Sequence, residues 1–69
     1  MDQPGCHVTE VVGASDESVE AAIHDGVCRA TCPTDSLEWL EIVGVHSNVL
    51  RGVHRFRVDL RVGVRSAAA

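Results

Sequence analysis

Residues 53–65 show the most regular pattern of apolar and polar positions in the chain. Apolar residues occupy the even positions and mainly charged residues the odd ones: Phe56, Val58, Leu60, Val62 and Val64 against Arg55, Arg57, Asp59, Arg61, Gly63 and Arg65. Alternation with a period of two is typical of a strand that buries one face. The pattern therefore predicts a strand over residues 53–65 whose even positions face the core.

Apolar residues at three- and four-residue steps predict one helix in the N-terminal half. The stripe consists of Val19, Ala22, Ile23, Gly26, Val27 and Ala30. Ser15 is the predicted N-cap, and the carboxylates that follow it suit the positive end of a helix. Pro33 is expected to end the helix after about Cys32, because proline cannot continue it. The stripe indicates which face of the helix packs on the core.

Two further strands are predicted around this helix. One covers residues 7–13 and stops at Gly13, and the other runs from Leu37 to about Ser47, before a turn over residues 48–52. If the last strand lies between the other two, every neighbouring pair is antiparallel and the helical crossover is right-handed. The predicted fold is α+β, with β-α-β-β order and a three-stranded antiparallel sheet that the helix covers on one face.

Trp39 is predicted to lie on the face of the sheet that the helix leaves uncovered. Leu40 and Ile42 are the natural core positions of their strand, so alternation sends the remaining apolar and acidic residues to the other face: Leu37, Trp39, Glu41, Val43 and Val45, beside Arg55, Arg57, Arg61 and Arg65. A large apolar side chain on such a face requires a cover. The cover is another subunit, a flat aromatic ligand that stacks on the indole, or both.

The length of the chain favours a single domain over residues 1–69, with an ordered core over about residues 7–65. A chain of 69 residues buries only about 60% of the surface that its unfolded form exposes, so it needs additional stabilisation. Three cysteines do not form a disulfide framework and indicate a reducing compartment. Self-association is therefore the expected source of stability, and the cytoplasm the expected location.

The charge balance and the lengths of the apolar runs each argue against one class of partner. A formal charge of −4 does not favour general binding to nucleic acid, although residues 42–69 hold five arginines and one acid. That basic region suits an anionic group or an acidic neighbouring subunit. No apolar run reaches the roughly 18 residues that a membrane span requires, so no membrane partner is expected.

One row of potential metal ligands lies on the predicted helix. His24, Cys28 and Cys32 follow Glu20 at four-residue steps, on the side opposite the apolar stripe. Such spacing suits Zn²⁺, but one helix supplies no fourth ligand, so we expect surface or subunit contacts here and no metal site. No phosphate loop is present and a small sheet offers no deep cleft for a nucleophile, so an enzyme is not expected.

Five segments between residues 8 and 65 together resemble the dodecin family. They are Val12-Gly13-Ala14-Ser15, Ser18-Val19-Glu20-Ala21-Ala22-Ile23, Arg29-Ala30, Leu37-Glu38-Trp39-Leu40-Glu41-Ile42 and Val58-Asp59-Leu60-Arg61-Val62-Gly63-Val64-Arg65. The resemblance implies β-α-β-β subunits whose sheet partly wraps the helix, assembled as a hollow homododecamer. It also implies a protein that stores or sequesters a flavin, namely FMN, riboflavin or FAD, in pairs near two-fold axes.

The same resemblance implies three cofactor-binding residues. Trp39 matches the family's strand tryptophan, which stacks on the isoalloxazine ring. The family's last-strand glutamine, which binds the polar edge of the ring, is replaced here by Arg57, which donates hydrogen bonds but cannot accept them. Arg65 matches a terminal arginine and is expected to contact a ligand phosphate or to form an ion pair. The alternative is a shell of the same architecture that has lost flavin binding and holds another ligand or acts in assembly.

Overall fold

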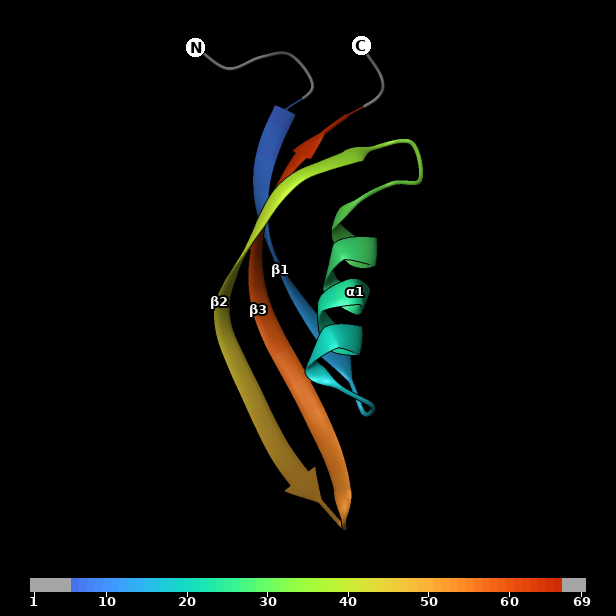
Figure 1. The fold of residues 1–69 in the computed structure, drawn as a ribbon, viewed down its shortest axis with the longest axis vertical. Helices are drawn as coiled ribbons and strands as arrows, with labels where there is room; N and C mark the ends of the chain where they lie inside the picture. Colours follow the sequence, from blue (N-terminus) through green and yellow to red (C-terminus); the bar gives the residue numbers. More distant parts are fainter. Residues whose placement is uncertain (1–5, 67–69) are drawn as a thin grey trace.

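The computed structural model describes residues 6–66, and Figure 1 shows their arrangement. The elements are β1 (Cys6–Ser15), α1 (Val19–Ala30), β2 (Ser36–Leu50) and β3 (Val53–Arg65). The strand order is β1-β3-β2, and both pairings are antiparallel. The predicted α+β fold with β-α-β-β order is therefore confirmed, while residues 1–5 and 67–69 of the predicted domain lie outside the described residues.

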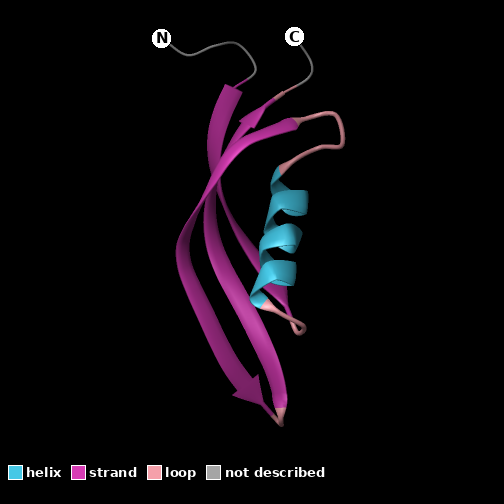
Figure 2. Cartoon of the chain, viewed as in Figure 1, coloured by secondary structure: helices cyan, strands magenta, loops and turns pink. Residues whose placement is uncertain are grey.

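The core lies between α1 and the central strand β3. Its buried side chains are Ala22, Val58, Leu60, Val62 and Val64, and Val11, Val19, Ile23, Val27, Ala30 and Phe56 pack against them. The even positions of β3 thus face the helix, as their alternation predicted, and the helical stripe is confirmed as the packing face. Figure 2 shows the helix on the concave side of the curved sheet.

Several element boundaries differ from those predicted. β1 continues to Ser15, so the N-cap of α1 is Ser18, whose Oγ accepts a hydrogen bond from the Ala21 N–H at 3.0 Å. The helix ends at Ala30, earlier than expected, because Thr31 leaves the helical conformation.

The β2–β3 turn is also shorter than predicted. β2 extends to Leu50, and Arg51 and Gly52 alone form the turn, with φ of 54° and 79°. Positive φ at both central residues matches the right-handed twist of the two strands, which is why such two-residue turns join hairpins. Residues 48–50, predicted to belong to the turn, instead extend the sheet.

Two irregularities in β2 change the predicted faces of that strand. The pairing register shifts between Leu37 and Trp39 and again between Ile42 and Gly44. Each extra residue reverses the alternation. Leu37 and Val45 consequently pair with Val64 and Val58 and lie on the helix side, contrary to the prediction.

The helix packs on β1 and β3 and leaves β2 beside it. Every residue of β2 except Gly44 is exposed. The helix covers one face of the sheet, as predicted, but only over β1 and β3. No helix within residues 6–66 is long and apolar enough to cross a membrane.

Gly13 and Gly26 allow β1 and α1 to approach closely. A Cβ on Gly13 would collide with the Ala22 carbonyl oxygen and would lie 2.6 Å from the Gly26 nitrogen. Both contacts are with backbone atoms, which cannot rotate away. The distance between helix and sheet therefore depends on the absence of a side chain at position 13.

Replacing Gly13 tests this close approach. Gly13→Ala is expected to lower the free energy of unfolding by about 3 kcal/mol, the upper end of the usual range for overpacking. Gly44→Ala is the control, because its Cβ would lie 3.4 Å from the nearest atoms, in ordinary contact. Urea unfolding of the two variants measures the difference, and equal losses would contradict the prediction.

Asp25 ties α1 to the end of β1. Its Oδ2 accepts hydrogen bonds from the Ala14 N–H and the Arg29 Nε–H, each at 3.0 Å. The Ala14 hydrogen bond first, and then Arg29, lower the pKa of Asp25. Because the ionised carboxylate is favoured in the folded state, its contribution to stability is present at neutral pH and is lost as pH falls through the folded pKa.

We therefore expect Asp25→Asn to lower the melting temperature at pH 7. The difference from the parent protein should shrink as pH falls below about 4, the ordinary pKa of aspartate, because the unfolded chain then binds a proton that the folded state, with its lowered pKa, does not yet hold. Thermal unfolding followed by circular dichroism from pH 7 to pH 2.5 measures it. Asp16→Asn is the control, since no hydrogen bond or ion pair of Asp16 occurs in the described part of the chain. A pH-independent difference would argue against the mechanism.

Candidate functional site

The sheet face opposite α1, called here the outer face, carries Trp39 and most of the charged side chains of the sheet. The pairing register assigns to it Val8, Glu10, Val12 and Ala14 of β1, Trp39, Glu41, His46 and Asn48 of β2, and Arg55, Arg57, Asp59, Arg61, Gly63 and Arg65 of β3. Trp39 therefore shares a face with the four arginines, as predicted. The uncovered aromatic side chain and the basic strip lie on one continuous surface.

Trp39 lies directly across the central strand. It pairs with Gly63, and a Cβ at Gly63 would collide with Nε1 and Cε2 of the indole. The absence of a side chain at position 63 thus lets the indole rest on the backbone of β3. The side chain remains 44% exposed, so one side of the ring is supported and the rest is open to a stacking partner.

The cations close to Trp39 are matched by carboxylates. Arg65 Nε lies 3.3 Å from Glu38 Oε2, and Arg61 bridges Glu10 at 3.4 Å and Glu41 at 3.5 Å. The ion-pair interpretation of Arg65 thus has a partner in its own chain. Because these side chains are about half exposed, each pair contributes little stability, and Arg65, which has one carboxylate partner, can turn to a ligand at small cost.

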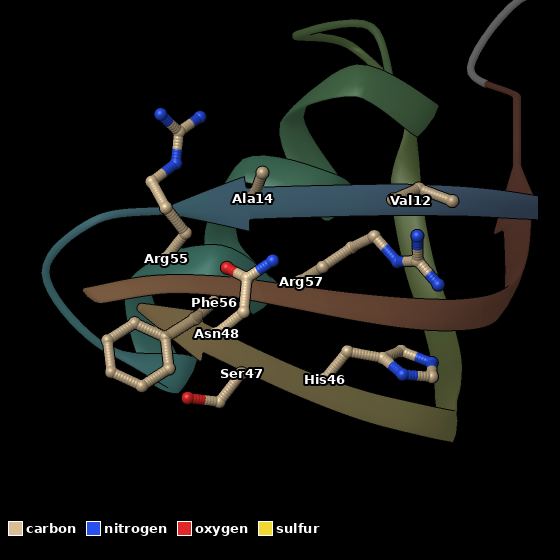
Figure 3. Close-up of a pocket in the computed structure, with 8 residues that line it drawn as sticks. All are labelled: Val12, Ala14, His46, Ser47, Asn48, Arg55, Phe56 and Arg57. Atoms are coloured by element: carbon tan, nitrogen blue, oxygen red, sulfur yellow. The ribbon is translucent and has the colours of Figure 1, made fainter. Parts of the chain in front are cut away.

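Arg57 lies at the other end of the outer face, in a different environment. Its Nε is 3.6 Å from Asp59 Oδ1, and the other oxygen of that carboxylate is 3.2 Å from His46 Nε2. Arg57 and His46 also line an open groove, together with Val12, Ala14, Ser47, Asn48, Arg55 and Phe56 (Figure 3). Figure 3 shows the Asn48 amide between the side chains of Arg55 and Arg57.

One chain does not bring the three predicted site residues together. Gly63, beneath Trp39, and Arg57 are six residues apart on the same strand, which corresponds to about 20 Å at the usual rise per residue. Arg65 is only two residues from Gly63 and therefore lies beside Trp39. A single protomer thus presents Trp39 and Arg65 at one end of the face and Arg57 at the other.

Sequence reasoning missed the residues that surround Arg57. His46 was given no role in the sequence analysis and Asn48 was placed in the turn, whereas both lie on the outer face opposite Arg57 and Arg55. The apolar pair Val49-Leu50 directly before Arg51-Gly52 was the signal for a longer strand and a two-residue turn. With that turn, Asn48 would have been placed in the sheet beside His46.

The row of potential metal ligands on the helix is shorter than the spacing suggested. Cys28 Sγ lies 3.8 Å from His24 Nδ1, but the helix ends at Ala30, so Cys32 is not on the same helical face. Among residues 6–66 no group of three or more histidine, cysteine or acidic side chains could hold a metal ion. The helix therefore brings together two of the three residues of that row.

Comparison with known proteins identifies the family of this chain. The family model described as Dodecin matches residues 6–66. The chain is 37% identical over 57 residues to a dodecin of Thermus thermophilus, covering 81% of this chain and 83% of the relative. Its fold matches the solved structure of a dodecin from Streptomyces davaonensis with a TM-score of 0.74 and 36% identity, covering 87% and 90% of the two chains. The β-α-β-β fold, the exposed strand tryptophan and these matches agree, and the chain belongs to the dodecin family.

Proposed function

We propose that this protein stores a flavin, without catalysing a reaction on it, in a hollow shell of twelve copies. Dodecins bind flavins and form homo-oligomers. The observation that carries the proposal is the geometry of Trp39, whose indole rests on Gly63 and remains open on its other side. A flat isoalloxazine ring has the shape and apolar surface to cover it.

The exposed apolar residues support the assembly. Large apolar side chains are exposed along β2 and its neighbours: Val8, Val12, Leu37, Trp39, Leu40, Ile42, Val43, Val45, Val49, Leu50 and Val53. Most of them lie on one strand and on both of its faces, so no single layer of the same chain would cover them. Contacts with further copies bury such a surface, which monomers seldom leave in water.

The flavin site is composite in this proposal. Because Arg57 lies about 20 Å from Trp39 within one chain, a flavin stacked on Trp39 and close to Arg65 meets the Arg57 of a neighbouring copy. The guanidinium donates to a carbonyl of the ring edge or to another acceptor of the ligand. Where two such arginines approach at a two-fold axis, Asp59 beside each of them reduces their repulsion.

Each residue of the site then has a binding role only. Trp39 supplies apolar contact and an electron-rich ring that quenches the excited state of the bound flavin. Arg65, released from Glu38, interacts with the anionic part of FMN or FAD, whereas riboflavin lacks that group. We further infer a cytoplasmic location, where exposed Cys28 and Cys32 remain reduced.

The second candidate is a shell that has lost flavin binding and holds another ligand or acts in assembly. Arg57 favours it, because this side chain has no acceptor for the N–H of a flavin ring edge and is already engaged by Asp59. The two candidates share the fold and the assembly. They differ in whether Trp39 stacks on a flavin.

Truncation of Trp39 tests the stacking. Trp39→Ala is expected to weaken FMN and riboflavin binding by about 10- to 100-fold, since stacking on an aromatic side chain contributes about 1–3 kcal/mol. Trp39→Phe should lose less, because it keeps a ring. Quenching of flavin emission measures the affinity, and light scattering verifies that both variants keep their oligomeric state. Undiminished emission with excess parent protein would remove the storage function.

Restoring the family's glutamine separates the two candidates. If the site holds flavin, Arg57→Gln should give no gain in riboflavin affinity, because the arginine already serves a ring acceptor. The same emission titration measures the variant beside the parent, with Arg61→Gln as a charge-matched control on the same strand. A gain of about tenfold or more would favour the second candidate, since it would show that the native residue opposes flavin.

A further inference from the structure

Two potential metal ligands lie on the exposed side of α1, away from the outer face of the sheet. His24 and Cys28 are four residues apart within α1, and both are exposed. The helix packs on the core through other positions, among them Ala22, Ile23 and Val27. The His24–Cys28 pair is therefore open to solvent on this chain.

The two side chains are already in contact. Cys28 Sγ lies 3.8 Å from His24 Nδ1 and 3.9 Å from Nε2, so either ring nitrogen is close to the sulfur. A zinc ion bound tetrahedrally to a sulfur at about 2.3 Å and a nitrogen at about 2.0 Å holds these two atoms about 3.5 Å apart. The observed spacing is therefore close to that of a chelated ion. Rotation of the exposed imidazole can turn one nitrogen lone pair toward it.

The helix fixes the spacing of the pair. Residues four apart lie on the same helical face, and two ligands at this spacing also hold zinc in the His-Glu-x-x-His motif. Both positions lie inside α1, which runs from Val19 to Ala30, so their separation does not depend on a loop. A pair of ligands that is held in place before binding loses little conformational freedom when it binds an ion.

The charges around the pair favour a cation. Glu20 lies one helical turn before His24 on the same row and adds a negative charge. Arg29 follows Cys28 in the sequence, but it is paired with Asp25 Oδ2 at 3.0 Å, so its charge is compensated. A cation at the pair consequently has a carboxylate nearby, and the one arginine of α1 already has a partner.

We propose that His24 and Cys28 bind one Zn²⁺ per chain in an exchangeable site on the surface of α1. The Cys28 sulfur binds as the thiolate, its proton passing to solvent, and one nitrogen of the neutral His24 ring is the second ligand. Water fills the remaining positions, because residues 6–66 provide no metal-binding group of three or more such side chains. The lack of a fourth protein ligand argues against a structural zinc site but not against a site that water completes.

This site is independent of the proposed flavin storage. Trp39 lies on the outer face of the sheet, opposite α1, whereas His24 and Cys28 lie on α1 itself. A flavin on the outer face therefore contacts neither ligand of the same chain. The chain would hold a metal ion and a flavin on separate surfaces.

Cobalt is the probe, because Co²⁺ replaces Zn²⁺ in sites of this kind and its bond to a thiolate gives an absorption band in the near ultraviolet. The assembled, reduced protein is titrated with Co²⁺ and then with Zn²⁺. We expect saturation at one Co²⁺ per chain with a thiolate band. Added Zn²⁺ should remove the band, because thiolate ligands select Zn²⁺.

Two variants test the ligands. Cys28→Ser should abolish the thiolate band, and Cys28→Ser and His24→Ala should each weaken Zn²⁺ binding by about tenfold or more, since each loses one of two protein ligands. Cys32→Ser is the matched control, because it removes an exposed thiol that lies beyond the end of the helix. Its affinity should stay within about threefold of the parent. Saturating Zn²⁺ should raise the melting temperature of the parent and of Cys32→Ser, but not that of Cys28→Ser.

Three results would overturn the proposal. Absence of a thiolate band in the parent would leave the pair with a hydrogen bond only. A band that persists in Cys28→Ser, or an equal loss in Cys32→Ser, would show that the thiolate comes from elsewhere in the chain. Saturation at one Co²⁺ for two chains would replace the single-chain site by one that joins two copies. FMN should change none of these titrations, and the emission titrations of Trp39→Ala judge the flavin proposal separately.

Discussion

The mismatch between one short helix and one long strand governs this fold. α1 has 12 residues and spans about 18 Å, whereas β2 has 15 residues and measures about 50 Å along its curved path. A helix about 10 Å across also covers only two strands spaced by about 4.8 Å. β2 therefore has no cover in its own chain, and its apolar side chains depend on surfaces from elsewhere. Members of the dodecin family form homo-oligomers, and contacts between copies can cover apolar side chains of this kind.

The length of the strands also divides the chemistry of the outer face. Trp39 and Arg65 lie near one end, where glutamates pair with Arg61 and Arg65. Arg55 and Arg57 lie near the hairpin, where a single aspartate faces two arginines and His46. One chain thus carries two surfaces with different charge surroundings, separated by about 20 Å along β3.

Most of the fold could be predicted from the sequence, because an element that buries one face repeats its apolar residues with a fixed period. The alternation around Val58 and Leu60 and the stripe through Ala22 were sufficient to predict β3, the helix and the position of the core. Prediction failed where no such period applies. Two inserted residues in β2 reversed the faces of Leu37 and Val45, and this strand, exposed on both sides, gave no apolar alternation that would reveal the shifts.

The sequence predicted which face of the sheet carries the candidate site residues, but not their positions along the strands. Alternation puts Trp39 and Arg57 on the same side of the sheet, and the structure agrees, but only the pairing register shows that position 39 is opposite position 63. A ligand that uses both residues must therefore lie between copies. In the proposed assembly, binding and oligomerisation are therefore coupled: contacts that bury β2 would bring the two half-sites together, and a ligand that bridges them would stabilise those contacts. In that proposal Arg57 would affect both processes through one guanidinium, so its charge as well as its position would bear on which ligand is held.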